Sequence, residues 1–219
     1  MILAPPFSPE DFQRETAVSR ETLLLLETYA ALLDKWSRAI NLVSRASLRD
    51  LWRRHMLDSA QLLPLLPTGP AARRRVIVDL GSGAGFPGMV LAVLGAGEVH
   101  LVESDRRKAV FLREVARETR SDARIHDQRI EDMPPIAADV VTARACAPLR
   151  KLLKYAHEIP GPAPGMHPCC LFLKGKRVDE ELTEARKQWT MRLDTFPSRS
   201  DPSGTILRIG LLDREITIL

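Results

Sequence analysis

The sequence predicts an α/β fold, in which helices cover both faces of a mostly parallel sheet behind a small helical N-terminal extension. Short apolar runs alternate with helical segments through most of the 219 residues, as parallel strands and crossover helices do. A glycine-rich stretch directly follows the first run, where open parallel sheets bind their ligands. We assign residues 1–70 to the extension and residues 71–219 to the sheet domain.

Capping residues and apolar spacing predict the helices of the extension. Ser8, followed by proline and two acids, begins a first helix, and Ser19 caps a second. Apolar residues of the second helix recur at spacings that share one buried face: Leu23, Leu26, Ala30, Leu33 and Ile40. Ser47 and Asp50 form an aspartate variant of the capping box before a helix over residues 51–63. Helix-breaking residues then end the extension: Pro64, Pro67, Gly69 and Pro70.

The sheet domain is predicted from five apolar runs and the segments between them. The runs that predict strands are residues 76–79, 99–103, 124–126, 139–142 and 170–173. Helical patterns cover residues 88–94, 106–118, 149–156 and 179–189. The tail, residues 205–219, predicts one or two further strands, which we expect at the sheet edge.

Positive charge is concentrated before residue 55. The whole chain has a net charge of +4, yet residues 35–54 alone carry six cations against one acid, Asp50. The cations are Lys35, Arg38, Arg45, Arg49, Arg53 and Arg54. Such a cluster is typical of a surface that binds nucleic-acid phosphates, and equally of a solvated helix face. The sequence alone leaves both interpretations open.

Cysteine usage and apolar patterning exclude several classes of protein. The three cysteines, Cys146, Cys169 and Cys170, form neither a disulfide framework nor a metal-binding pair, and the histidines lack metal-ligand spacing. We therefore expect reduced thiols and no metal. No apolar run approaches the roughly 20 residues that span a bilayer, and no secretory pattern opens the chain. We expect a cytoplasmic protein that contacts no membrane.

The glycine-rich stretch begins with Asp79 at the end of the first strand and contains Gly81, Gly83 and Gly85 before Phe86. Glycine lets the backbone turn sharply and approach a ligand, and the helix that follows presents unpaired N–H groups. The stretch also fits the GxGxxG dinucleotide fingerprint. Asp79 and the extra Gly81 nevertheless favour the GxGxG form that is typical of methyltransferases.

Residues at the ends of later strands complete a predicted nucleoside site. Glu103 ends the second strand, where a carboxylate can accept both hydroxyl groups of a ribose. NAD-dependent enzymes use the same contact, so Glu103 indicates a nucleoside without choosing between cofactors. Ile130 and Glu131 follow the third strand, and they either border an adenine or form an ordinary turn. Arg144 ends the fourth strand, where it either faces the substrate or is a solvated terminus.

Short strings of residues in a specific order resemble one known family. The strings are Asn41-Leu42, Arg54-His55 with Asp58-Ser59, residues 79–88, residues 101–104, Lys108 with Phe111-Leu112, Arg129 with Glu131, residues 142–145, and Lys174-Gly175. Together they resemble the ribosomal RNA small-subunit methyltransferase G family, also called glucose-inhibited division protein B. The resemblance runs from about residue 33 to about residue 182. The GxGxG element by itself would not identify the family, because most methyltransferases share it.

Two stretches depart from the family pattern. The family usually has Trp-Asn where this chain has Trp36-Ser37. It usually has a Gly-Gly turn before the fifth strand, where this chain has the proline-rich residues 160–168. We expect this stretch to lengthen a loop near the substrate side.

The resemblance implies a class I, Rossmann-like methyltransferase that uses S-adenosylmethionine and releases S-adenosylhomocysteine. It implies that the substrate is the N7 atom of one guanine in 16S ribosomal RNA, within the small ribosomal subunit. It also implies a set of residues that line the cofactor site: Gly81, Phe86, Ile130, Glu131 and Arg144. The ribose and loop arguments add Asp79, Gly83, Gly85 and Glu103.

No catalytic base is expected, because guanine N7 carries a lone pair and no proton. Catalysis would come from holding N7 in line with the methyl group. We expect Arg144 and Lys174, which end neighbouring strands, to provide this positioning and to face the RNA. The predicted RNA-binding residues are Arg53, Arg54, His55, Arg144 and Lys174. His55, Asp58 and Ser59 share one helical face, which either touches RNA or docks the helix onto the domain.

Three other functions are consistent with parts of the sequence. An NAD-dependent oxidoreductase would share the glycine stretch and Glu103, but neither a proton-transfer residue nor a second βαβ half is apparent. A non-catalytic RNA-binding protein on a methyltransferase scaffold is a second alternative. A methyltransferase that acts on a small molecule or a protein is the third. The basic cluster favours RNA, and we expect a monomer.

Overall fold

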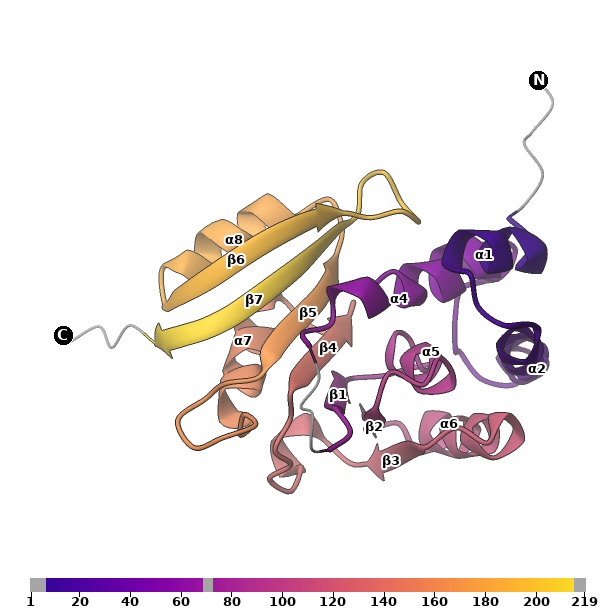
Figure 1. Cartoon of the computed structure of the whole chain (residues 1–219), viewed down its shortest axis with the longest axis horizontal. Coiled ribbons are helices and arrows are strands. Elements are labelled where there is room, and N and C mark those ends of the chain that lie inside the picture. Colours follow the sequence, from indigo (N-terminus) through magenta and orange to yellow (C-terminus); the bar gives the residue numbers. More distant parts are fainter. Residues whose placement is uncertain (1–6, 69–72, 215–219) are drawn as a thin grey trace.

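The computed structural model describes residues 7–68 and 73–214, and in this part of the chain seven strands form one sheet (Figure 1). Their spatial order is β3-β2-β1-β4-β5-β7-β6. The first five strands are parallel and confirm the five predicted runs: β1 (Val76–Leu80), β2 (Glu98–Glu103), β3 (Ala123–Asp127), β4 (Val140–Arg144) and β5 (Cys169–Lys174). An antiparallel hairpin, β6 (Trp189–Pro197) and β7 (Thr205–Arg214), completes the sheet.

Helices cover both faces of the sheet, which confirms the predicted fold class. Alternate residues of a buried strand point to opposite faces. In β1, Ile77 packs into one apolar core, whereas Val78 and Leu80 pack into the other. The helices that follow the strands are α5 (Gly88–Val93), α6 (Arg106–Thr119), α7 (Leu149–Glu158) and α8 (Val178–Arg186). Among residues 7–68 and 73–214, no helix is long and apolar enough to cross a bilayer.

The first two helices, α1 (Pro9–Thr16) and α2 (Arg20–Ser37), begin at the predicted caps, Ser8 and Ser19. The predicted cap at Ser47 is wrong. Ser44 Oγ accepts the Ser47 backbone N–H at 3.1 Å and so caps α3 (Arg45–Leu48). The expected helix over residues 51–63 is confirmed as far as residue 60: a π-helical stretch, η1 (Trp52–Leu57), runs directly into α4 (Asp58–Ala60), and a separate 3-10 turn, η2 (Leu63–Leu65), follows. Ile40 lies beyond the end of α2 and is only half-buried.

The extension and the sheet domain share one apolar core, because α2 packs against α5 and α6. Tyr29 of α2 is buried at this contact. Its hydroxyl donates to the Ala84 carbonyl oxygen in the glycine-rich stretch, and its ring stacks on Phe86 at 5.4 Å. The boundary that we drew at residue 70 falls within residues 69–72, which lie outside the described residues.

The end of the chain differs from the sequence prediction. Trp189, which we assigned to a helix, is the first residue of β6, because α8 ends at Arg186. The tail forms one strand in its described part, β7, which lies between β5 and β6 and not at the sheet edge. Residues 215–219 lie outside the described residues.

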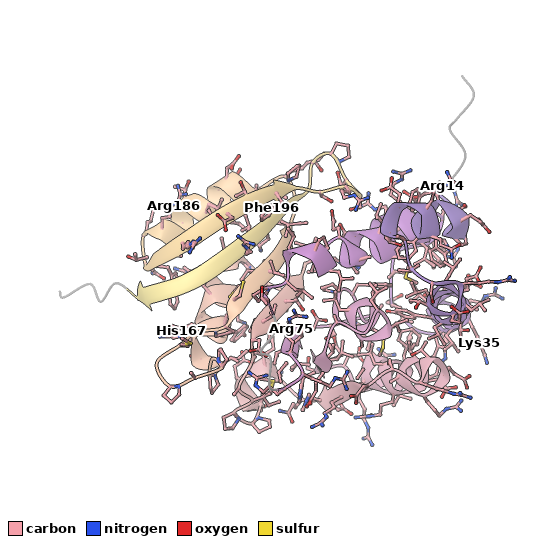
Figure 2. All side chains as sticks on the ribbon, in the orientation of Figure 1. Arg14, Lys35, Arg75, His167, Arg186 and Phe196 are labelled. Carbon is pink, nitrogen blue, oxygen red and sulfur yellow. The ribbon has the colours of Figure 1, made fainter. Side chains whose placement is uncertain are left out.

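The proline-rich residues 160–168 lie at the amino ends of the parallel strands, whereas the glycine-rich stretch lies at their carboxyl ends. They precede β5, and the Pro160 carbonyl oxygen accepts the N–H of Ala138, which precedes β4. Figure 2 shows His167 on this loop, and Arg75 immediately ahead of β1. The expectation that this loop lies near the substrate side is therefore wrong, because a segment that enters a parallel strand lies at the amino ends of the strands.

Candidate functional site

Two hollows open at the carboxyl ends of the parallel strands, where such sheets bind ligands. The small cavity has a volume of about 180 Å³ and is lined by Gly81, Val102, Glu103, Ser104, Gln128, Arg129, Ile130, Glu131, Cys146, Ala147, Lys151 and Tyr155. The large cleft has a volume of about 720 Å³. Its walls come from the extension, from the ends of β4 and β5 and from the loop between β6 and β7. Cys146 and Ala147 line both hollows.

Gly81 forms part of the small cavity because its missing side chain leaves room for Cys146. Its φ angle is +61°, in the left-handed region that favours glycine. A Cβ atom at this position would overlap Cys146 Sγ. The backbone of the first turn after β1 can therefore approach the residues that follow β4 closely.

Glu103 is a buried carboxylate that the backbone holds in place. Its Oε2 accepts the Gly83 N–H at 2.8 Å and its Oε1 accepts the Asp105 N–H at 2.7 Å. Each carboxylate oxygen has room for more than one donor. Glu103 is thus oriented toward the small cavity with acceptor capacity left for the two hydroxyl groups of a ribose.

Another part of the lining of the small cavity is a short helical turn, η3 (Ile130–Asp132). Glu131 accepts a hydrogen bond from the Tyr155 hydroxyl at 2.5 Å, which lowers the pKa of that carboxyl group. Lys151, 3.9 Å from Glu131, lies beside this pair. The structure therefore brings Gly81, Glu103 and the Ile130–Glu131 pair together, although they come from three separate segments of the sequence.

Other predicted cofactor residues lie outside the lining of the small cavity. Gly83 takes part through its N–H to Glu103. Asp79 is fully buried and accepts a hydrogen bond from Thr142 at 2.7 Å, so it ties β1 to β4 beneath the glycine-rich stretch. Gly85 and Phe86 face the extension: a Cβ atom on Gly85 would lie 2.5 Å from Tyr29 Oη, and Phe86 packs between Tyr29 and His55.

Arg144 lies in the large cleft and joins the domain to the extension. Its guanidinium group donates to His55 Nδ1 at 2.7 Å and to the Arg54 carbonyl oxygen at 2.9 Å. It also lies 3.3 Å from Asp58 Oδ2 and 4.9 Å above the ring of Phe86. Because His55 is only 7% exposed and bonded to Arg144, this geometry favours docking over RNA contact for the shared helical face.

Asp58 also connects the extension to the loop between β6 and β7. Its Oδ1 accepts hydrogen bonds from Gln61 at 2.9 Å and from Ser200 at 2.5 Å. Figure 1 shows the tip of this hairpin beside the segment that contains α4. This wall of the large cleft was not predicted from the sequence, because β6 was not predicted.

The predicted RNA-binding residues lie in different surroundings. Arg54 lines the large cleft, 3.9 Å from Asp201. Arg53 lies instead beside α1, with its guanidinium group 4.6 Å above the ring of Phe7. Lys174 lines the cleft, but its side chain is only 6% exposed and forms an ion pair with Glu181. Among the described residues, no three His, Cys, Asp or Glu side chains gather as a metal site.

Two buried groups give opposing pH dependences of stability. Burial, together with the charge of Arg144, lowers the pKa of His55 from 6.5 to about 3. Burial raises the pKa of Asp79 from 3.8 to about 6. On unfolding, His55 therefore takes up a proton between pH 6.5 and 3, whereas Asp79 releases one between pH 6 and 3.8. The two contributions cancel between about pH 4 and pH 6.

We expect single variants to reveal the two halves of this compensation. In Asp79→Asn, the free energy of unfolding should fall relative to the parent by about 1.4 kcal/mol for each pH unit below 6, because the opposing Asp79 contribution is gone. In His55→Gln the free energy of unfolding should rise relative to the parent as the pH falls below 6. Urea unfolding at pH 4, 5, 6 and 7 measures both differences. Differences that do not vary with pH would contradict the assigned protonation states.

Five parallel strands completed by the antiparallel hairpin β6–β7, together with the glycine turn after β1, form the class I S-adenosylmethionine-dependent methyltransferase fold. Solved structures agree with this class. A mutant of MtNAS in complex with S-adenosylmethionine has a TM-score of 0.56 and 14% identity, over 94% of this chain and 85% of that chain. A TehB-like S-adenosylmethionine-dependent methyltransferase from Corynebacterium glutamicum has a TM-score of 0.53 and 14% identity, over 85% and 97%.

Sequence comparison then identifies the family. The family model for rRNA small subunit methyltransferase G matches residues 23–200. The protein named Ribosomal RNA small subunit methyltransferase G from Rhodospirillum centenum is 56% identical over 94% of this chain and 92% of its own length. The protein of the same name from Rhodospirillum rubrum is 55% identical over 94% and 99%. The chain belongs to the rRNA small subunit methyltransferase G family.

Proposed function

We propose that the protein transfers a methyl group from S-adenosylmethionine to the N7 atom of a guanine in 16S ribosomal RNA of the small ribosomal subunit. The observation that carries the proposal is the shared wall: Cys146 and Ala147 border both the small cavity and the large cleft. A donor in one hollow and a base in the other would meet there. Family membership supports RNA as the substrate, and we expect a monomer that works in the cytoplasm, where ribosomal subunits are assembled.

The lining of the small cavity fits the nucleoside part of the methyl donor. The buried carboxylate of Glu103 would hold the ribose, and Ile130 and Glu131 would border the adenine. At Gly81, space that a Cβ atom would fill lets the chain approach closely. When bound, S-adenosylmethionine supplies a methyl group on a positively charged sulfur atom.

The residues around the large cleft fit a reaction that needs no proton transfer. Guanine N7 is unprotonated, so no side chain has to remove a proton from it. His55 is bonded to Arg144, and its lowered pKa keeps it neutral at pH 7. Asp79 is enclosed between β1 and β4 and lines neither hollow. Arg144 would act by position, since holding reactants in a near-attack arrangement can supply about 7–11 kcal/mol of a barrier.

The base must leave its RNA loop to enter the cleft, because base-modifying enzymes reach their target atom only when it is unstacked. N7 must stay open to the methyl group, so the usual arginine contact to guanine O6 and N7 is excluded. Recognition would therefore use the Watson–Crick edge of the base.

Mapping of the modified nucleotide tests this function. Small ribosomal subunits are incubated with the enzyme and S-adenosylmethionine labelled in its methyl group, and the labelled position is found by chemical cleavage at 7-methylguanine. One labelled guanine in 16S RNA is the expected result. Label in protein alone would contradict the proposal, and binding of subunits without turnover would indicate a non-catalytic RNA-binding protein. Tighter binding of NAD than of S-adenosylmethionine would favour an oxidoreductase.

Arg54 and Arg53 are expected to differ in their effect on RNA binding. Arg54 lines the large cleft and is exposed, whereas Arg53 stacks on Phe7 away from it. Log affinity falls as log salt concentration rises, and Arg54→Ala should make this fall less steep by about 0.7–0.9 in slope, the contribution of one phosphate contact. Arg53→Ala should change the slope less. Filter binding of small subunits between 50 and 200 mM salt (about the range over which phosphate contacts are lost) measures both, with Arg117→Ala on α6 as the control. Equal slopes for all three variants would contradict the assignment of Arg54.

A further inference from the structure

One short segment, residues 145–148, separates the two hollows. It follows β4 directly, and all four of its residues line the large cleft. Cys146 and Ala147 line the small cavity as well. Ala145 has a φ angle of +51°, in the left-handed region that non-glycine residues enter only at an energetic cost. Other contacts must therefore hold this segment in its conformation.

Lys174 and Glu181 supply these contacts. Lys174 Nζ donates to the Ala147 carbonyl oxygen at 3.0 Å and to Glu181 Oε2 at 2.7 Å. The same Glu181 oxygen accepts the N–H of Leu149, the first residue of α7, at 2.5 Å. The pair thus holds the backbone on both sides of Pro148. It also joins three elements, because Lys174 ends β5 and Glu181 lies in the first turn of α8.

These contacts argue against a phosphate-binding role for Lys174. An ammonium group has three donors, and two of those on Lys174 already reach protein acceptors. The side chain of Lys174 is 6% exposed, and that of Glu181 is 26% exposed. A phosphate would have to approach the buried ammonium group of Lys174 next to the carboxylate of Glu181, which is negatively charged like the phosphate. Separating the pair would also leave a poorly solvated charge without its partner.

We propose that Lys174 and Glu181 are a positioning pair, which fixes residues 145–148 and thereby the spacing between the methyl donor and the target base. This inference rests on the proposed function. It assigns to Lys174 a role in the wall between the two sites and no direct contact with RNA. A displacement of about 1 Å between reacting groups can lower a rate about 100-fold, so the rate should be sensitive to this wall.

The test separates the rate of methyl transfer from binding. In Lys174→Met, the single-turnover rate should fall at least about tenfold, while the dissociation constant for small subunits and its salt slope stay unchanged. Glu181→Met should show the same pattern. Glu181→Gln keeps an oxygen acceptor for Leu149 and should recover part of the lost rate. Lys176→Met, which removes an exposed lysine two residues along the chain, is the matched control for charge.

A readout that is independent of activity uses the Leu149 amide. Its hydrogen exchange should accelerate in Lys174→Met and Glu181→Met, and it should stay at the parent value in Lys176→Met. The double variant Lys174→Met/Glu181→Met should lose no more rate than either single variant, because the two residues act as a unit.

Several outcomes would overturn the inference. A weaker affinity for subunits with a flatter salt slope at an unchanged rate would make Lys174 a phosphate contact. A parent-like rate and parent-like Leu149 exchange in Lys174→Met would show that the pair does not fix residues 145–148. If Lys174→Met does not fold, Glu181→Gln is compared with the parent instead. A parent-like rate and parent-like Leu149 exchange in Glu181→Gln would then overturn the inference. Failure of the parent enzyme to methylate any RNA would contradict the proposed function, whereas the exchange of Leu149 would still report on the pair.

Discussion

Glu103→Ala is expected to weaken the binding of S-adenosylmethionine by at least about 100-fold, or about 2.7 kcal/mol. A hydrogen bond to a charged group contributes about 1.5–3 kcal/mol, and this carboxylate would make two to the ribose. Alanine would also leave the N–H groups of Gly83 and Asp105 without their acceptor, so the glycine-rich stretch would lose its anchor. Titration calorimetry with S-adenosylmethionine and S-adenosylhomocysteine measures the effect. Both ligands should lose affinity alike, because they share the ribose.

Asp127→Asn provides the matched control. Asp127 ends β3 and pairs in register with Glu103, but its carboxylate faces Arg113 at 3.4 Å and lines neither hollow. The affinity of the Asp127→Asn protein for S-adenosylmethionine should remain within about threefold of the parent value, a difference of less than about 0.7 kcal/mol. Thermal unfolding checks that Glu103→Ala still folds. A folded Glu103→Ala protein with parent-like affinity would place the nucleoside elsewhere.

Features that depend on neighbouring residues in the chain could be predicted from the sequence. The five parallel strands, the caps at Ser8 and Ser19 and the turn at Gly81 are each encoded within a few residues. The carboxylate at the end of β2 could be predicted as well, since its position follows from that of the strand. The class of fold and the outline of the proposed nucleoside site are therefore largely local properties.

Features that depend on distant partners could not be predicted. Nothing near Lys174 in the sequence indicates that its ammonium group bonds to the carbonyl oxygen of Ala147, 27 residues earlier in the chain. Likewise, Asp58 reaches Ser200 across more than half of the chain. The pattern around Trp189 is compatible with a helix, and its pairing with β7 overrides that local preference. Cys146 follows a recognised string directly, which is the one signal that could have placed it at the site.

Gly85 shows how the same loop residue can serve a ligand or a fold. Its φ angle is +98°, and its missing Cβ atom would lie 2.5 Å from Tyr29 Oη and 2.8 Å from Met89 Cβ. Gly85→Ala should therefore lower the free energy of unfolding by about 3–5 kcal/mol, from backbone strain and overpacking together. Urea unfolding measures the loss. Gly210→Ala in β7, where the new Cβ atom would lie 3.8 Å from Arg192 Cβ, should change stability by less than about 1 kcal/mol.

The double variant Gly85→Ala/Tyr29→Phe separates the two roles. Removing the Tyr29 hydroxyl relieves the closest overlap, so the double variant should be less destabilised than the sum of the single variants. Such coupling would mean that this glycine admits α2 of the extension to the loop. A stable Gly85→Ala protein that loses only its affinity for S-adenosylmethionine would mean instead that the residue faces the donor. Under the first outcome the extension supports the proposed cofactor site, because Tyr29 holds the glycine-rich stretch through the Ala84 carbonyl oxygen.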